Sequence, residues 1–161
     1  MVVNNLYPFE ETIKNLNSTH EDIIENIDIG GPSMIRAAAK NYKFVTVIVD
    51  PADYDKVLDE LKIKSDVCLK TKEYLARKVF NYTAFYDALI ADYFNGLTGT
   101  KFPEMISIPY KQSQKLRYGE NPHQQACFYK EVREVSGSIS SGKQLHGKEL
   151  SFNNINDSNA A

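Results

Sequence analysis

Residues 44–62, FVTVIVDPADYDKVLDELK, decide the fold of the first part of the chain. The run 44–49 is rich in β-branched residues, which pack well on a pleated sheet and predict a strand. Asp50 follows it as a candidate helix cap, and Pro51 suits a first helical turn because its φ is already helical. We therefore expect a strand that leads directly into a helix ending near residue 62.

Strands and helices alternate on the N-terminal side of this stretch. Residues 1–7 predict a strand that runs into Pro8, and helices are expected over 21–27 and 33–41. Ser33 is a candidate cap for the second of these helices, which three consecutive alanines support. Such alternation is typical of an α/β fold with a parallel sheet.

Residues 65–95 predict a single long helix, because apolar residues recur there at intervals of three and four. At 1.5 Å per residue it would be about 45 Å long. Ser65 is expected to cap its start and Gly96 to end it. It carries the aromatic residues Phe80, Phe85, Tyr86, Tyr93 and Phe94. This spacing favours packing in a core or a dimer interface over a cofactor-binding face.

The pattern changes after Gly96. Residues 97–105, LTGTKFPEM, contain turn residues without periodicity and predict a linker between a domain over 1–96 and another over 106–161. Beyond the linker, short strands are expected, among them 106–110, 115–118 and 126–130. The last eleven residues, SFNNINDSNAA, predict the beginning of a helix.

The composition is that of a soluble globular protein, with 42% hydrophobic and 25% charged residues. The net charge of -2 gives no electrostatic reason to expect nucleic acid or an anionic membrane as partner. Cys68 and Cys127 lie far apart without metal-ligand spacing, which favours buried free thiols. Neither a secretory signal nor a run of about 18 apolar residues is found. We expect a cytoplasmic protein without a bound metal.

The first candidate site residues lie in two short motifs, NLYPF at 5–9 and IDIGGPS at 27–33. Tyr7 is placed where a strand ends, and ligands of open sheets bind at the carboxyl ends of strands. Asp28 precedes two glycines that let backbone approach a ligand, and then a helix start that favours negative charge. The alternatives are that Tyr7 packs on the turn and that Asp28 only caps the helix. Lys40, at the end of that helix, could simply complement the helix dipole.

Together, NLYPF and NIDIGGPSMIRAAAKN (26–41) resemble the inosine monophosphate (IMP) cyclohydrolase domain of the bifunctional purine biosynthesis enzymes. The resemblance implies that Tyr7, Asp28 and Lys40 are catalytic and that Asn5 and Gly30 bind substrate. In this chemistry a carboxamide nitrogen attacks a formyl group and water is lost. A lysine can stabilise the developing oxyanion, while a tyrosine and an aspartate move protons. No metal or redox cofactor is needed.

A second pair of motifs, LRYGENPHQ at 116–124 and LSFNNINDSNAA at 150–161, resembles the beginning of the aminoimidazole carboxamide ribonucleotide (AICAR) transformylase domain of the same family. The resemblance implies that Arg117 and Tyr118 bind the substrate ribonucleotide and that Asn154 contacts it. The fork of an arginine suits a phosphate. His123 is a further candidate near the substrate, or else a structural residue.

The family resemblance implies a fold and an activity for the whole. The fold would be α/β: the C-terminal part of a methylglyoxal-synthase-like parallel-sheet domain, then the start of a cytidine-deaminase-like α/β transformylase domain. The activity would be formyl transfer from 10-formyltetrahydrofolate to AICAR, then dehydrative closure of formyl-AICAR to IMP, in a homodimer. The family's phosphate-binding loops and its Arg-x-Lys-Thr-x-His-Pro segment are not found before Met1. We therefore expect an internal fragment with incomplete activity. The alternative is a catalytically inactive nucleotide-binding or dimerisation module.

Overall fold

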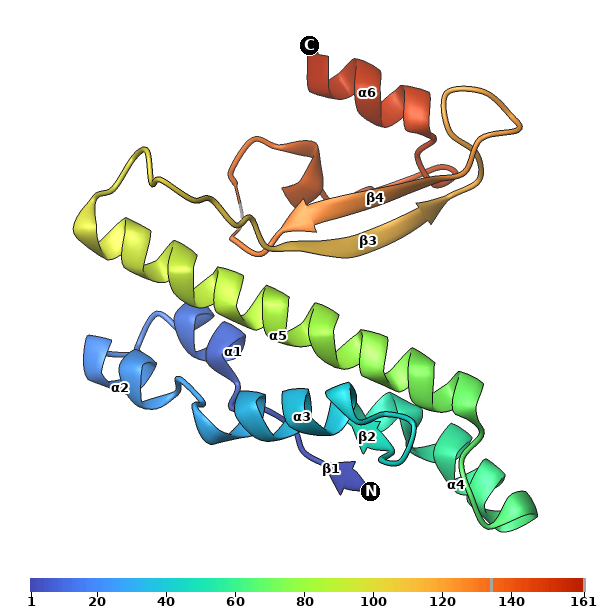
Figure 1. Cartoon of the computed structure of the whole chain (residues 1–161). Helices are drawn as coiled ribbons and strands as arrows, with labels where there is room; N and C mark the ends of the chain where they lie inside the picture. Colours follow the sequence, from blue (N-terminus) through green and yellow to red (C-terminus); the bar gives the residue numbers. More distant parts are fainter. Residues whose placement is uncertain (134, 161) are drawn as a thin grey trace. The chain divides into compact units, whose positions relative to one another are not determined.

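The computed structural model describes residues 1–133 and 135–160. It divides into two compact units, Met1–Ser107 and Ile108–Ala161, which are described here one at a time. Within the described residues the structure is mixed α/β, with a small parallel sheet in the first unit and a small antiparallel sheet in the second (Figure 1). No helix of the described residues is long and apolar enough to cross a membrane.

The sheet of the first unit is made of β1 (Val2–Val3) and β2 (Val47–Ile48), which run parallel as predicted. Val2 N–H donates to the Thr46 carbonyl at 2.8 Å and Asn4 N–H donates to the Ile48 carbonyl at 3.0 Å. Both strands are shorter than the runs 1–7 and 44–49, because backbone pairing extends only across these few residues.

Three helices follow β1: α1 (Phe9–Lys14), α2 (His20–Glu25) and α3 (Gly30–Lys40). Helix α1 was not expected; it is anchored by Phe9, whose side chain is only 1% exposed. Helix α3 begins before the predicted position, so the prediction of Ser33 as its cap is wrong. Ser33 instead lies inside the first turns and donates its hydroxyl to the Ile29 carbonyl at 3.2 Å.

The strand-to-helix turn after β2 agrees with the prediction for Asp50. The Asp50 carboxylate accepts a hydrogen bond from Ala52 N–H at 2.9 Å. A short 3-10 helix, η1 (Pro51–Asp53), leads into α4 (Tyr54–Lys64). The cap therefore joins the sheet to the helical layer.

The long helix exists as α5 (Leu69–Thr98), although both predicted ends are wrong. Ser65 ends α4 in the left-handed region, with φ 57°, instead of starting α5. Gly96 lies inside the helix, and Gly99, with φ 64°, follows its last residue. Figure 1 shows α5 running along the whole first unit, in contact with α1, α3 and β2. Its inward face is the centre of the core, with Leu75, Val79 and Tyr86 buried.

The second unit is built on a hairpin of β3 (Tyr110–Leu116) and β4 (Ala126–Glu131). A 3-10 turn, η2 (Ile139–Ser141), and the helix α6 (Phe152–Ala160) follow. The strand expected at 126–130 and the C-terminal helix are confirmed. The strand expected at 106–110 is wrong except for Tyr110, because the pairing partner of β4 is the polar stretch that follows.

Candidate functional site

The first candidate site is built around the carboxylate of Asp28, which precedes α3. One of its oxygens, Oδ2, accepts a hydrogen bond from Tyr7 N–H at 3.3 Å. The other, Oδ1, accepts one from Gly31 N–H at 2.7 Å. The carboxylate thus joins the segment after β1 to the first turn of α3. The structure therefore brings together Tyr7 and Asp28, which are 21 residues apart in the sequence.

The two glycines of the motif have different surroundings. A Cβ atom on Gly31 would collide with the carboxylate of Asp28, so any other residue at this position would force the carboxylate or the helix start to move. A Cβ on Gly30 would meet no heavy atom of the described residues within 4 Å. Gly30, the predicted substrate-binding glycine, therefore presents open backbone at the start of α3.

Tyr86, a buried residue of α5, holds the loop that carries Asp28 through hydrogen bonds. Asp28 N–H donates to the Tyr86 hydroxyl at 2.9 Å, and this hydroxyl donates to the Asn26 carbonyl at 3.0 Å. Burial is the main cause that raises the pKa of Tyr86, and the hydrogen bond from the Asp28 backbone opposes it. Sequence reasoning placed Tyr86 only in an aromatic stripe. The sequence feature that could have indicated its role is a hydroxyl-bearing side chain on the apolar face of the predicted long helix.

The remaining predicted residues of this site lie at different distances from Asp28. Asn5 and Tyr7 are exposed after β1, and the Tyr7 side chain is 55% exposed. Lys40 is at the other end of α3, ten residues from Gly30, which corresponds to about 15 Å along the helix axis. Within one copy of the chain, the structure does not bring Lys40 into contact with Asp28. Their catalytic roles stay predictions.

A second polar cluster of the first unit surrounds Lys78 of α5. Its Nζ lies 2.7 Å from Asp50 Oδ2 and 2.6 Å from Asp53 Oδ2. Tyr74 donates its hydroxyl to Asp53 Oδ1 at 3.2 Å, and Asp53 is only 5% exposed. The hydrogen bond from Lys78 is the main cause that lowers the pKa of Asp50. This cluster fixes the turn after β2 against α5 and was not foreseen from the sequence.

In the second unit, three predicted substrate-binding residues share the loop between β3 and β4. The guanidinium of Arg117 lies 5.9 Å from the centre of the Tyr118 ring. Arg117 and His123 are exposed, and Tyr118 is half-buried. Gly119 N–H donates to the Gln124 carbonyl at 2.9 Å, which closes the loop. An exposed cation beside an aromatic ring can contact both the phosphate and the base of a nucleotide.

Asn154 has a defined structural role at the start of α6. Its Oδ1 accepts hydrogen bonds from Ser151 N–H at 3.1 Å and from the Ser151 hydroxyl at 2.9 Å. Its own N–H donates to the same hydroxyl at 3.3 Å. The two residues thus form a reciprocal helix cap. A contact between Asn154 and a nucleotide stays a prediction.

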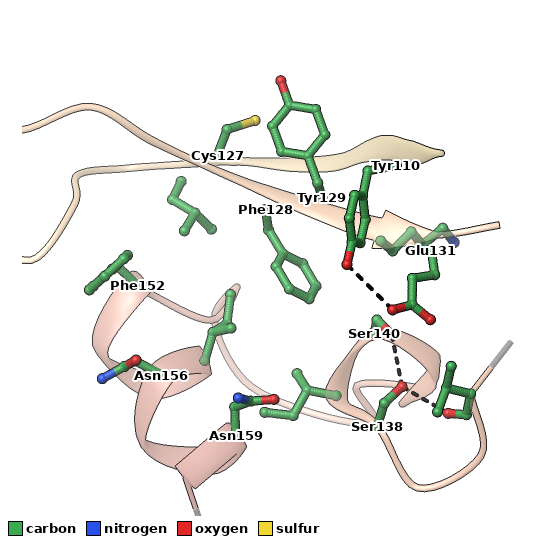
Figure 2. A pocket seen from close by; sticks show the side chains of 15 residues that line it. Tyr110, Cys127, Phe128, Tyr129, Glu131, Ser138, Ser140, Phe152, Asn156 and Asn159 are labelled. Atoms are coloured by element: carbon green, nitrogen blue, oxygen red, sulfur yellow. Dashed lines mark hydrogen bonds between the residues drawn. The ribbon is translucent and has the colours of Figure 1, made fainter. Parts of the chain in front are cut away.

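A cavity of about 390 Å³ lies in the second unit between β4, η2 and α6 (Figure 2). Phe128, Phe152 and Ile155 supply apolar surface. Tyr110 donates its hydroxyl to Glu131 Oε1 at 3.4 Å beside them. The described residues that line the cavity do not include any of the four predicted substrate-binding residues of this unit. In the described part of the chain, no group of three or more His, Cys, Asp or Glu side chains is placed to hold a metal ion.

Comparison with known proteins identifies strong relatives of the whole chain. The family model described as "AICARFT/IMPCHase bienzyme" matches residues 38–161. A "Bifunctional purine biosynthesis protein PurH" of Listeria monocytogenes serotype 4b (strain CLIP80459) is 60% identical over 161 residues, all of this chain and 32% of that protein. The protein of the same description from Bacillus subtilis (strain 168) is 58% identical, over all of this chain and 31% of that protein.

A solved structure is also similar. It is described as "Crystal structure of ForH", is 35% identical, and superposes with a TM-score of 0.51 over 62% of this chain and 52% of that chain. The chain spans about a third of the length of the curated relatives named above, for example 32% of the Listeria protein.

Proposed function

The chain belongs to the AICARFT/IMPCHase bienzyme family, and on this premise we propose that it contributes to both activities of a purine biosynthesis enzyme. These are formyl transfer from 10-formyltetrahydrofolate to AICAR and the closure of formyl-AICAR to IMP. The first unit belongs to the cyclohydrolase part and the second to the transformylase part. The observation that carries the proposal is the Asp28 carboxylate, hydrogen-bonded to the Tyr7 and Gly31 amides between the segment after β1 and the start of α3.

The proposed ring closure is a nucleophilic addition followed by loss of water, and both steps require proton transfers. The carboxamide nitrogen attacks the formyl carbon, a C–N bond forms, and the formyl oxygen takes the electron pair of its double bond. The attacking nitrogen then loses one proton, and the formamide nitrogen loses a second as its lone pair forms the ring C=N bond. The C–O bond breaks in this step, and the oxygen, which has received two protons, leaves as water. An exposed phenol (Tyr7) and a fixed carboxylate (Asp28) can accept and donate these protons. A cation such as Lys40 can stabilise the oxyanion.

The transformylase role of the second unit rests on its exposed loop. Arg117 and Tyr118 would bind the phosphate and ring of AICAR, with His123 beside them on the same loop. Asn154 would contact the nucleotide from the start of α6. These assignments are supported by the residue order of the two motifs and by the open position of Arg117.

The finer fold assignment belongs to the same proposal. The parallel pair β1–β2 covered by helices supports the C-terminal part of a methylglyoxal-synthase-like domain at 1–96. The hairpin followed by α6 supports the start of a cytidine-deaminase-like domain at 106–161. It would follow a linker at 97–105, whose first two residues form the end of α5. The whole protein would be a homodimer that acts in the cytoplasm.

The test uses a chimera in which this chain replaces the matching segment of the Bacillus subtilis relative. Ring closure and formyl transfer are measured separately, each by the absorbance change of its substrates. We expect Asp28→Asn to lower the kcat of ring closure at least a hundredfold and to leave formyl transfer unchanged. Asp22→Asn, which alters a carboxylate cap of α2, is the matched control and should retain ring closure.

In the second unit, a substitution should affect formyl transfer instead of ring closure. Arg117→Ala should raise the KM for AICAR in formyl transfer at least tenfold, whereas Lys115→Ala, on the neighbouring strand β3, should not. If the chimera binds IMP but catalyses neither reaction, the chain is a nucleotide-binding module and the proposal is wrong.

A further inference from the structure

The buried hydroxyl of Tyr86 contacts the backbone of Asp28 but has no role in the proposed reaction steps. We propose that Tyr86 is a positioning residue that keeps Asp28 in register with Tyr7 for ring closure. The inference rests on the proposed cyclohydrolase function of the first unit. It concerns a residue of α5, which is far in sequence from both motifs that carry the predicted catalytic groups.

The hydroxyl of Tyr86 forms hydrogen bonds with two backbone groups of the loop between α2 and α3, in place of water. It accepts from Asp28 N–H at 2.9 Å and donates to the Asn26 carbonyl at 3.0 Å, so two backbone groups of that loop depend on one atom. Tyr86 is 4% exposed. Because water has little access to this point, removal of the hydroxyl would leave the loop without an equivalent partner.

The ring of Tyr86 packs against Phe9 and so supports the segment that carries Tyr7. Its centre lies 5.9 Å from the ring of Phe9, in an edge-to-face arrangement. Phe9 is 1% exposed and starts α1, two residues after Tyr7, and its N–H donates to the Tyr7 carbonyl at 2.8 Å. One side chain of α5 thus fixes the segment of Tyr7 through its ring and the loop of Asp28 through its hydroxyl.

The hydrogen bond from Tyr7 N–H to Asp28 Oδ2 then closes this arrangement. At 3.3 Å it is a long bond and not a strong restraint by itself. The position of the carboxylate therefore depends on the hydrogen bonds between the Tyr86 hydroxyl and the backbone of the loop. Proton transfer is sensitive to small displacements of the acid or base, so a loosened loop should lower kcat more than it weakens substrate binding.

The chain itself contains a matched control. Tyr93 lies seven residues further along α5, which places it on the same face. Its ring also packs on Phe9, at 6.3 Å, but its hydroxyl contacts His20 Nδ1 at 2.7 Å instead of the Asp28 loop. Tyr93→Phe therefore removes a hydroxyl from the same helix without releasing Asp28.

The first experiment measures amide hydrogen exchange by NMR on the chain as it stands. In Tyr86→Phe the exchange of the Asp28 amide should accelerate at least tenfold, because its acceptor is gone while the ring remains. In Tyr93→Phe it should stay within twofold of the unchanged chain. Equal exchange at Asp28 in all three proteins would overturn the inference.

The second experiment measures ring closure in the chimera. Tyr86→Phe should lower kcat about tenfold with KM within twofold, and Tyr93→Phe should keep kcat within twofold. In an Asp28→Asn background, Tyr86→Phe should cause no further loss, because Tyr86 acts through Asp28. If Asp28→Asn lowers kcat and Tyr86→Phe does not, the inference is wrong and the proposed function stands. If Asp28→Asn leaves kcat unchanged, the proposed function fails and the inference fails with it.

Discussion

At the scale of single residues, Asp28 shows how one carboxylate can cap a helix and still belong to a site. It accepts hydrogen bonds from Gly31 N–H and Tyr7 N–H, at 2.7 and 3.3 Å. The helix-cap interpretation of the motif and the site interpretation are therefore compatible. Negative charge at the start of a helix also interacts favourably with the helix dipole.

The glycine pair of this motif gives a prediction that can be tested by stability alone. Gly31→Ala places a methyl group against the Asp28 carboxylate, so the carboxylate or the helix start must move. We expect a loss of about 1–3 kcal/mol in the free energy of unfolding, as for other overpacked sites. Gly30→Ala is the control: its methyl group has open space, and alanine favours helix by up to about 1 kcal/mol. Denaturant unfolding measures both, and equal losses would contradict this account.

Much of this site was predictable at the residue level, and the reason for the rest is geometric. Tyr7 and Asp28 stand in local motifs that follow a strand and precede a helix, and the hydrogen bond from Tyr7 N–H to the Asp28 carboxylate joins these two segments. Tyr86 could not be assigned in the same way. Its role depends on which face of α5 packs over the Asp28 loop, and helical periodicity alone does not say which loop a face will cover.

At the scale of elements, the junction between α4 and α5 is held by side chains that were not foreseen. Glu60 accepts from Cys68 N–H at 2.7 Å and from the Thr71 hydroxyl at 2.5 Å. The cap of helix α5 is therefore Cys68, three residues beyond the predicted cap, Ser65. Strand β3 was predicted only at its ends, Tyr110 and 115–116, for a similar reason: the stretch between them is polar, and pairing with β4 makes it a strand. Contacts between elements decided both cases.

The Glu60 junction predicts a specific pH dependence. The hydrogen bond from Thr71, followed by that from Cys68, lowers the pKa of Glu60 from its ordinary value of 4.5. A group whose pKa is lower in the folded state stabilises the fold above its unfolded pKa. This stabilisation is lost as pH falls through the folded value, so stability should decline from about pH 5 downward. Glu60→Gln should reduce the difference in Tm between pH 7 and pH 3.5, whereas Glu25→Gln in α2 should not. An unchanged difference in Glu60→Gln would contradict the assignment.

The Lys78 cluster predicts a larger effect, because one of its carboxylates is buried. Lys78→Met leaves Asp53, whose side chain is 7% exposed, without its cation. Breaking a buried ion pair costs roughly 3–5 kcal/mol, and the partial exposure of Lys78 lowers our expectation to about 2–4 kcal/mol. Lys72→Met is the control: its partner Asp66 is 75% exposed and can return to water, so we expect about 1 kcal/mol or less. Urea unfolding of the two variants compares them, and a smaller loss for Lys78→Met would show that the cluster does not hold the turn.

At the scale of the whole molecule, the chain combines two compact units whose motifs belong to one family. Composition and strand–helix alternation were sufficient to predict a mixed α/β fold, since these signals are local. They could not show that the predicted catalytic lysine would be separated from its partners. That separation follows from the length of α3, with Asp28 before its first turn and Lys40 at its last residue.

This separation leads to a prediction about the assembled enzyme. About 15 Å of helix lies between Gly30 and Lys40, too far for Lys40 to reach the Asp28 carboxylate of the same copy. The proposed homodimer would supply a second Lys40, and we expect that one to complete the site. Chimeras with Asp28→Asn and Lys40→Ala should each be inactive in ring closure. Mixed and refolded together at equal concentrations, they should recover about a quarter of the normal activity, because about half of the dimers are mixed and each has one intact site.

The control for this experiment mixes Asp28→Asn with the double variant Asp28→Asn, Lys40→Ala. Every site then lacks the carboxylate whichever copies pair, so no activity should return. Recovery in the first mixture alone requires that Asp28 of one copy and Lys40 of the other serve the same substrate. If neither mixture recovers while the unchanged chimera refolds to full activity, Lys40 acts within its own copy. The substrate itself would then have to span the distance along α3.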